Sequence, residues 1–183
     1  MEKYKHVIVI GIDGAGAFIK DADTPSFDRI FARGAVTYRA LASNPTISAE
    51  CWGSMLLGVG PEVHKLKNEI VSNRPYPVDA QFPTVFRRIR GAIPDAVLGS
   101  FCEWNSITFG IVESDLGVHH ATGKDIDLTV KICDFIKERK PLFLFCQIDS
   151  VDGAGHHFGY GSEGHLNQIH AVDSMVNDIY EAV

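Results

Sequence analysis

The segment HVIVIGID, residues 6–13, decides the fold class. It is a nearly continuous run of apolar, β-branched residues that ends in an aspartate and is followed by glycine. Strands that are buried on both faces of a parallel sheet have this composition. A second run of the same kind, PLFLFCQID at residues 141–149, also ends in an aspartate. The two runs together predict a mainly parallel sheet that is covered on both sides.

Segments with helical spacing of apolar residues separate these runs. Two more strands are expected at 35–43 and 95–101, and helices at 24–34, 48–58, 83–92, 124–140 and from 164 to the end. Strands that alternate with helices predict a three-layer α/β/α fold in one domain spanning residues 1–183. In such sheets, ligands bind beyond the carboxyl ends of the strands, so the polar residues at those ends are the candidates for function.

Two of the predicted helices carry a stripe of apolar residues that we expect to face the core. In the 124–140 segment the stripe consists of Ile126, Val130, Cys133 and Ile136. In the last segment it consists of Leu166, Ile169, Val172, Val176, Ile179 and Val183.

Composition excludes several classes of protein. The 183 residues are 45% hydrophobic and 22% charged, which is ordinary for a globular domain. The net charge of −6 argues against a nucleic-acid polymer as partner. No apolar run approaches the 18 residues of a membrane span, and no signal peptide precedes the first strand. The four cysteines lack CxxC spacing, which is typical of reduced thiols in a cytoplasmic protein.

The tetrapeptide Asp-Gly-Ala-Gly occurs twice, at residues 13–16 and 152–155, each time after a strand-like run. The second copy continues into Asp152-x-x-x-His156, whose carboxylate and imidazole can converge on one cation if the loop turns tightly. Oxygen and nitrogen ligands suit zinc or manganese. The alternative is that each copy is only a turn. A dinucleotide-binding loop is a poor alternative, because Ile19 stands where the third glycine would be.

The segment NPTISAECWGS, residues 44–54, offers two hydroxyls ahead of a predicted helix. Thr46 can be explained as a turn residue, and Ser48 as an N-cap. A serine at a helix N-terminus is also well placed to attack a phosphate, because the helix dipole and free amides favour the anion. Such a serine needs activation, which a divalent metal held partly by Asp13 would supply.

These motifs resemble the type I phosphodiesterase / nucleotide pyrophosphatase branch of the alkaline phosphatase superfamily. The resemblance is carried by the strand that ends in Asp13, by TPSFDRI, by PTISAECWGSMLLGVGPEVH and by DSVDGAGHHFG, in that order. It covers residues 5–68 and 141–176. Lys65 stands where the family has glycine.

The resemblance implies a phosphoric ester hydrolase with two divalent metal ions, zinc or manganese. Asp13 would bind one ion, together with Ser48, the nucleophile that forms a phosphoserine. Asp152 and His156 would bind the second ion. Asn68 would hold a phosphate oxygen, although it lies one residue early. The substrate would be a small phosphate ester or a nucleotide.

The remaining histidines are expected to have no catalytic role. His64 is interpreted as structural. His157, His165 and His170 are expected in packing or solvent positions, with His157 as the best spare ligand, and His119 and His120 in a loop. Residues 69–82, which include Arg74 and Tyr76, are the candidate specificity loop.

The resemblance also implies ligands that this chain lacks. Family members continue into an Asp-His pair and a later histidine, and no Asp-His dipeptide occurs here. We therefore expect the N-terminal part of a longer catalytic domain, with low activity, weak metal binding and an exposed sheet edge that favours homo-oligomers. A phosphomutase of the same superfamily and a non-catalytic α/β module are the alternatives. A sulfatase would need C-x-P-x-R, which is absent.

Overall fold

The structure, a computed structural model, describes residues 5–183. Its sheet contains the parallel strands β1 (Val7–Ile12), β2 (Leu98–Cys102), β3 (His119–Ala121) and β4 (Phe143–Ile148). The spatial order is β1-β4-β2-β3, so the last strand of the chain lies between the first two. Both runs that decided the fold class are strands, and they pair in parallel along their whole length.

The strands are connected by helices of very different lengths. The α-helices are α1 (Pro25–Phe31), α2 (Ser48–Leu57), α3 (Pro61–His64), α4 (Asn68–Asn73), α5 (Val85–Ala92), α6 (Ser106–Gly110), α7 (Asp125–Arg139), α8 (Ser150–Phe158) and α9 (Glu163–Ala182). Two 3-10 helices, η1 (Gly16–Asp21) and η2 (Ser114–Leu116), complete the described elements. No helix within residues 5–183 has the length and hydropathy needed to cross a bilayer.

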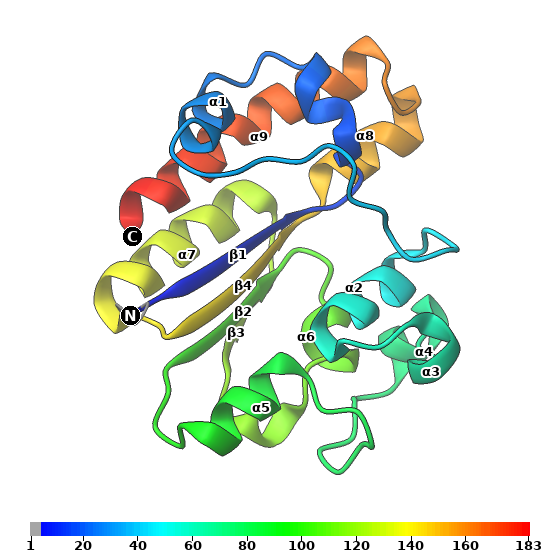
Figure 1. Cartoon of the computed structure of the whole chain (residues 1–183), viewed down its shortest axis with the longest axis vertical. Helices are drawn as coiled ribbons and strands as arrows, with labels where there is room; N and C mark the ends of the chain where they lie inside the picture. Colours follow the sequence, from blue (N-terminus) through cyan, green and yellow to red (C-terminus); the bar gives the residue numbers. More distant parts are fainter. Residues whose placement is uncertain (1–4) are drawn as a thin grey trace.

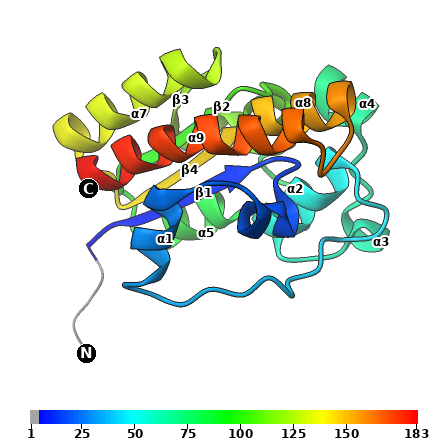
Figure 2. The same cartoon turned by 90° about the horizontal axis from the view of Figure 1, so that it is seen from above.

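Each face of the sheet is covered by its own helices (Figures 1 and 2). Phe143 and Phe145 of β4 pack with Trp52 of α2 and Phe86 of α5 on one side. Leu144 and its neighbours pack with α7 and the end of α9 on the other side. A third apolar cluster joins the ends of β1 and β4 to α1, α8 and α9. The three-layer α/β/α fold is therefore confirmed, because successive β4 side chains alternate between two helical layers.

The strand expected at 35–43 is wrong. This segment forms no regular element, and most of it is exposed, with Leu41 95% accessible. Its alternating pattern fits a strand, but a strand needs a partner for its backbone groups. The segment pairs with none of the four described strands.

The expected face of α7 is wrong at two of its four positions, since Ile136 is buried and Cys133 is partly buried against the core. Ile126 and Val130 are 65% and 59% exposed, whereas Leu128 and Ile132 are buried. Both sets of residues recur at helical spacing, so the periodicity alone could not choose between them. At the other end of the chain Val183 is 65% exposed, although the buried residues of α9 include four of the expected stripe.

Candidate active site

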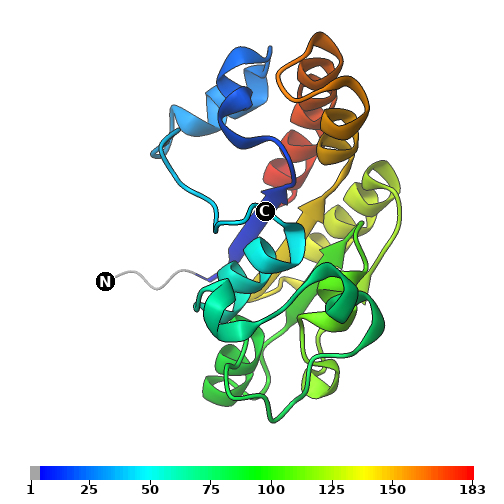
Figure 3. The ribbon, with the colours of Figure 1, turned by 90° about the vertical axis from the view of Figure 1, so that its right-hand side faces the viewer.

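A pocket of about 810 Å³ lies where β1 ends and α2 begins. Figure 3 views the sheet from the side where the strands end, with β1 and β4 between α2 and α8. Asp13, Thr46, Ser48, Asp152 and Tyr160 supply polar groups to the pocket wall. Three of the four expected metal ligands therefore line one cavity, although they come from opposite ends of the chain.

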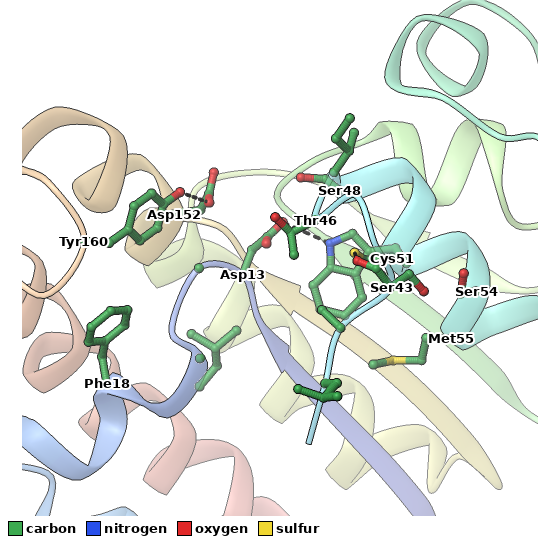
Figure 4. Close-up of a pocket in the computed structure, with 17 residues that line it drawn as sticks. Asp13, Phe18, Ser43, Thr46, Ser48, Cys51, Ser54, Met55, Asp152 and Tyr160 are labelled. Atoms are coloured by element: carbon green, nitrogen blue, oxygen red, sulfur yellow. Dashed lines mark hydrogen bonds between the residues drawn. The ribbon is translucent and has the colours of Figure 1, made fainter. Parts of the chain in front are cut away.

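Asp13 follows directly on β1, and its backbone N–H continues the ladder by donating to the Ile148 carbonyl at 2.9 Å. The indole N–H of Trp52 donates to Asp13 Oδ2 at 2.9 Å. Burial raises the pKa of the Asp13 carboxyl, which the Trp52 hydrogen bond opposes, and repulsion from Asp152 adds to the rise, while the nearby Ser48 hydroxyl lowers the pKa. Asp13 thus lies between Asp152 and the start of α2 (Figure 4).

Ser48 is the first residue of α2 and does not cap it. The N-cap position is taken by Ile47, whose side chain makes no capping hydrogen bond. The interpretation of Ser48 as an N-cap is therefore wrong, and its side chain lines the pocket. The ten-residue helix directs its first amides and the positive end of its dipole to the same place.

Asp152 and His156 lie on α8 and not in a tight loop. The second Asp-Gly-Ala-Gly is helical, so the two side chains are one turn apart. His156 Nε2 lies 3.3 Å from Asp152 Oδ2. The Tyr160 hydroxyl donates to the other oxygen, Asp152 Oδ1, at 2.6 Å. His156 does not line the pocket but contacts it through Asp152.

The spacing of Asp152 and His156 is that of two ligands of one divalent ion. A tetrahedral ion with ligands at about 2.0–2.1 Å separates neighbouring ligand atoms by about 3.3–3.4 Å, which is the spacing of Asp152 and His156. A cation would also offset the repulsion between Asp13 and Asp152. Each pair supplies only two ligands, however, and no group of three or more His, Cys, Asp or Glu side chains in residues 5–183 is arranged around one ion.

Asn68 begins α4 and contacts the residue after Ser48. Its Oδ1 accepts a hydrogen bond from the Ala49 backbone N–H at 2.9 Å. The side chain therefore satisfies one of the free amides of α2, and it does not line the pocket. The structure places Asn68 beside the expected nucleophile, in a structural contact.

The other histidines are distributed as follows. His64 Nδ1 accepts from the Leu66 N–H at 3.0 Å at the junction of α3 and α4. His165 is fully buried, and its ring nitrogens lie 3.1 Å from the Gly161 amide and 3.2 Å from the Gly14 carbonyl oxygen. His157 and His170 are exposed, the latter against the Asp23 carbonyl. His119 and His120 form part of β3, so their assignment to a loop is wrong.

The expected specificity loop does not reach the pocket. Tyr76 is buried, and its hydroxyl donates to the Phe82 carbonyl at 2.7 Å, inside the 69–82 segment itself. Arg74 is exposed, and neither side chain lines the pocket.

Three residues of the site were missed in the sequence. Trp52 and Tyr160 carry no motif, and only their contacts show that they hold carboxylates. Asp149 had a signal, because it is the residue that directly follows β4. Burial raises the pKa of Asp149, and repulsion from Asp13 adds to this, whereas the Gln147 amide, which donates at 2.6 Å, opposes it. Within the described chain, none of the pocket-lining residues is basic.

Solved structures with the same fold extend well beyond this chain. Murine ectonucleotide pyrophosphatase / phosphodiesterase 5, as an inactive variant in complex with AMP, has a TM-score of 0.74 at 16% identity, covering 98% of this chain and 52% of its own. Phosphonoacetate hydrolase from Sinorhizobium meliloti 1021, in complex with phosphonoformate, has a TM-score of 0.68 at 16% identity, with coverages of 97% and 53%. The chain thus spans about half the length of the structures it matches. No curated protein sequence matches it significantly.

The chain shares the fold of these solved structures. Residues 111–183 match the sequence family described as type I phosphodiesterase / nucleotide pyrophosphatase, which confirms the resemblance for the motif in residues 149–159. The matched segment contains Asp152 and His156 but not Asp13, Ser48 or Asn68.

Proposed function

We propose that this chain carries the site of a phosphoric ester hydrolase of the phosphodiesterase / nucleotide pyrophosphatase type, with Ser48 as the nucleophile. The observation that carries the proposal is that Ser48, the first residue of α2, lines one pocket together with the carboxylates of Asp13 and Asp152. The family match and the shared fold support the same class of reaction.

The residues of the chain have different roles in the proposed reaction. The positive end of the α2 dipole would attract the phosphoryl oxygens, although the Ala49 amide already donates to Asn68. Asp13 lies across the pocket from the start of α2, where it would help to hold the ion that activates Ser48. Attack forms the bond from Ser48 Oγ to phosphorus and breaks one ester bond of the substrate, so that Ser48 carries the phosphoryl group with its remaining ester. The serine proton passes to solvent, and the departing alkoxide takes up a proton and leaves as an alcohol. Water then attacks phosphorus, breaks its bond to Ser48 Oγ and releases a phosphate monoester.

Two divalent ions, zinc or manganese, complete the proposal. Asp13 and Ser48 would hold one, and Asp152 with His156 the other. When bound, these ions would lower the pKa of the serine hydroxyl and neutralise charge on the phosphate. Their role is larger here than in a basic pocket, because the lining residues in the described chain include no Lys, Arg or His.

The proposed substrate is a small phosphodiester or a nucleotide. The pocket wall is largely apolar beyond the carboxylates, with Phe18, Leu41, Ile47, Trp52 and Met55 contributing to it. A phosphodiester carries one negative charge at neutral pH, which suits a wall with two carboxylates better than the dianion of a monoester. The AMP complex of the murine neighbour is a property of that protein and agrees with this class.

Ser48→Ala tests the proposal. We expect turnover of a chromogenic phosphodiester, with added zinc or manganese, to fall by several orders of magnitude. Mass spectrometry of the quenched reaction should detect a phosphoryl adduct on the peptide that contains Ser48, and the adduct should be absent in the variant. Ser174→Ala is the control, since its hydroxyl bonds the Ala171 carbonyl on the exposed side of α9. Retention of more than about a tenth of the turnover would move the nucleophile to Thr46 or to water.

A non-catalytic module is the second candidate. The number of ligands favours it, since each expected ion has only two protein donors in residues 5–183. Tight binding of two ions with turnover that Ser48→Ala removes would exclude this candidate. Activity that is absent at every metal concentration would support it.

Two further expectations stay predictions. Each of the four cysteines is a free thiol, which agrees with the cytoplasmic location that we propose.

β1 lies at one edge of the sheet, and Val7 is 46% exposed there, so self-association would use this edge. Sedimentation analysis of the purified chain over a range of concentrations would test the expected self-association.

A further inference from the structure

Tyr160 lies in a turn that returns the chain onto the helix it has just left. The turn is Gly159-Tyr160-Gly161, and both glycines have positive φ, of 93° and 79°. Residues with a Cβ rarely adopt these angles, so the two glycines allow the reversal. As a result, the Tyr160 ring lies over α8 and its hydroxyl reaches the pocket (Figure 4).

The ring is held in this position from three sides. A Cβ on Gly155 would lie 2.3 Å from the ring, so the glycine provides the space that the ring fills. The rings of His156 and His165 contact it edge to face, with centroids 5.6 and 5.3 Å away. His165 is itself fully buried, and its ring contacts the Gly14 carbonyl and the Phe18 ring.

Tyr160 divides the two oxygens of the Asp152 carboxylate between two partners. Its hydroxyl donates to Oδ1 at 2.6 Å, which leaves Oδ2 facing His156 Nε2 at 3.3 Å. A free phenol keeps its proton well above neutral pH, so it acts as a donor here. The carboxylate is thereby fixed with one oxygen beside the imidazole, at the separation of two ligands of one tetrahedral ion.

The other carboxylate of the pocket is held in a similar way. Trp52 donates to one oxygen of Asp13 at 2.9 Å, and the bulk of its ring fills the space beside Gly11. Carboxylates that bind metals are commonly fixed by such outer hydrogen bonds, and loss of one typically lowers metal affinity by about 10- to 100-fold.

We propose that Tyr160 is a positioning residue that orients Asp152, together with His156, for a divalent cation. The inference rests on the proposed function and assigns to this chain a residue outside the motifs that carry the family resemblance. Tyr160 acts through Asp152 and does not itself bind the cation.

The test compares two tyrosine variants in the purified chain after treatment with chelator. Tyr160→Phe removes only the hydroxyl, and Tyr180→Phe makes the same change on α9, where the hydroxyl contacts Arg33 at 3.4 Å. Zinc is titrated to millimolar concentration against a chelating dye, and cobalt absorption reports the coordination of the bound ion. We expect Tyr160→Phe to weaken metal binding about tenfold or more, and Tyr180→Phe to leave it unchanged. Thermal melting of both variants should stay close to that of the wild type.

A second pair of variants separates this inference from the proposed function. Asp152→Asn should weaken binding, and adding Tyr160→Phe should then cause less than twofold further loss, because the tyrosine acts through Asp152. Gly155→Ala, which displaces the ring, should weaken binding like Tyr160→Phe. If Asp152→Asn weakens binding but Tyr160→Phe changes it less than twofold, the positioning role is overturned and the proposed function stands. A wild-type chain without measurable affinity overturns both.

Discussion

The two Asp-Gly-Ala-Gly segments have the same sequence but different backbone conformations. In residues 13–16 the chain turns out of β1, and Gly14 has a φ of +74° before η1 begins. In residues 152–155 the same four residues form part of α8. In both copies the alanine is buried. Both aspartates line the same pocket.

The surroundings decide between the two conformations. The second copy is helical because the buried Asp125 accepts hydrogen bonds from the Asp149 and Ser150 amides and so satisfies the start of α8. The first copy has to reverse direction against α8, and Gly14 packs directly on the backbone of Asp152. The comparison teaches that the sequence of the motif determines which side chain is offered to the site, whereas the residues packed against the motif determine its backbone conformation.

Equivalent glycines in the two copies should respond in opposite ways, and this is the largest effect we expect. A Cβ at Gly14 would lie 2.6 Å from the Asp152 Cα, and φ is unfavourable, so Gly14→Ala should destabilise the fold by about 2–5 kcal/mol. Gly153 is helical with open space around it, so Gly153→Ala should be neutral or stabilise by about 0.5–1 kcal/mol. Urea unfolding measures both. Equal effects would show that the two copies do not differ in this way.

The Asp13 carboxylate should make the stability of the metal-free chain depend on pH. The folded-state pKa of Asp13 is raised, mainly by burial, so the folded chain binds this proton more tightly than the unfolded chain. Its contribution to stability therefore decreases as pH rises above about 4, through the folded pKa. Asp13→Asn can still accept from Trp52, and it should be more stable than the wild type at pH 7 and equal to it near pH 3. Chelator-treated samples unfolded in urea at several pH values provide the measurement.

The smallest effect that we expect on stability is that of His156, the residue that follows the second Asp-Gly-Ala-Gly segment and has no counterpart after the first. His156 is 74% exposed, and its contact with Asp152 is an i, i+4 pair on a helix surface. Such pairs contribute about 0.3–0.5 kcal/mol, so His156→Ala should change the free energy of unfolding by less than about 0.5 kcal/mol. The same variant should weaken zinc binding clearly. A large loss of stability with unchanged zinc affinity would assign His156 a structural role.

The fold class could be predicted because the core strands carry their own signal. β4 is buried along its whole length and is apolar except for Gln147, and β1 has no polar side chain, which is the composition of strands in a doubly covered sheet. The segment 35–43 has a similar composition but forms no strand, because a strand is defined by its partner. For α7, two apolar stripes compete, and the sheet buries the one that contains Leu128 and Ile132. Local sequence predicts neither whether residues 35–43 find a partner strand nor which apolar stripe of α7 faces the sheet.

The site could be predicted in part, for a related reason. Asp13 and Ser48 were found because strand ends and helix starts are visible in the pattern, and Asp152 because the Asp-Gly-Ala-Gly sequence occurs again after a strand-like run. The structure brings all three to one pocket, although their chemical roles stay predictions. Trp52 and Tyr160 were missed because a hydrogen bond between residues 39 positions apart, as for Trp52 and Asp13, leaves no periodic trace.

The order of the strands has a consequence for how the protein is made. β1 pairs with β4, and His6 contacts the Pro141 carbonyl 135 positions further along the chain. At ordinary rates of translation, β1 therefore waits on the order of 10 s before its neighbour in the sheet leaves the ribosome. During that time its apolar surface lacks the cover that β4 gives it, and the pocket lacks the wall that Asp152 and Tyr160 supply until α8 and the turn after it follow. The newly synthesised N-terminal half should therefore bind chaperones of the holding type, and released N-terminal fragments should neither bind metal nor fold cooperatively.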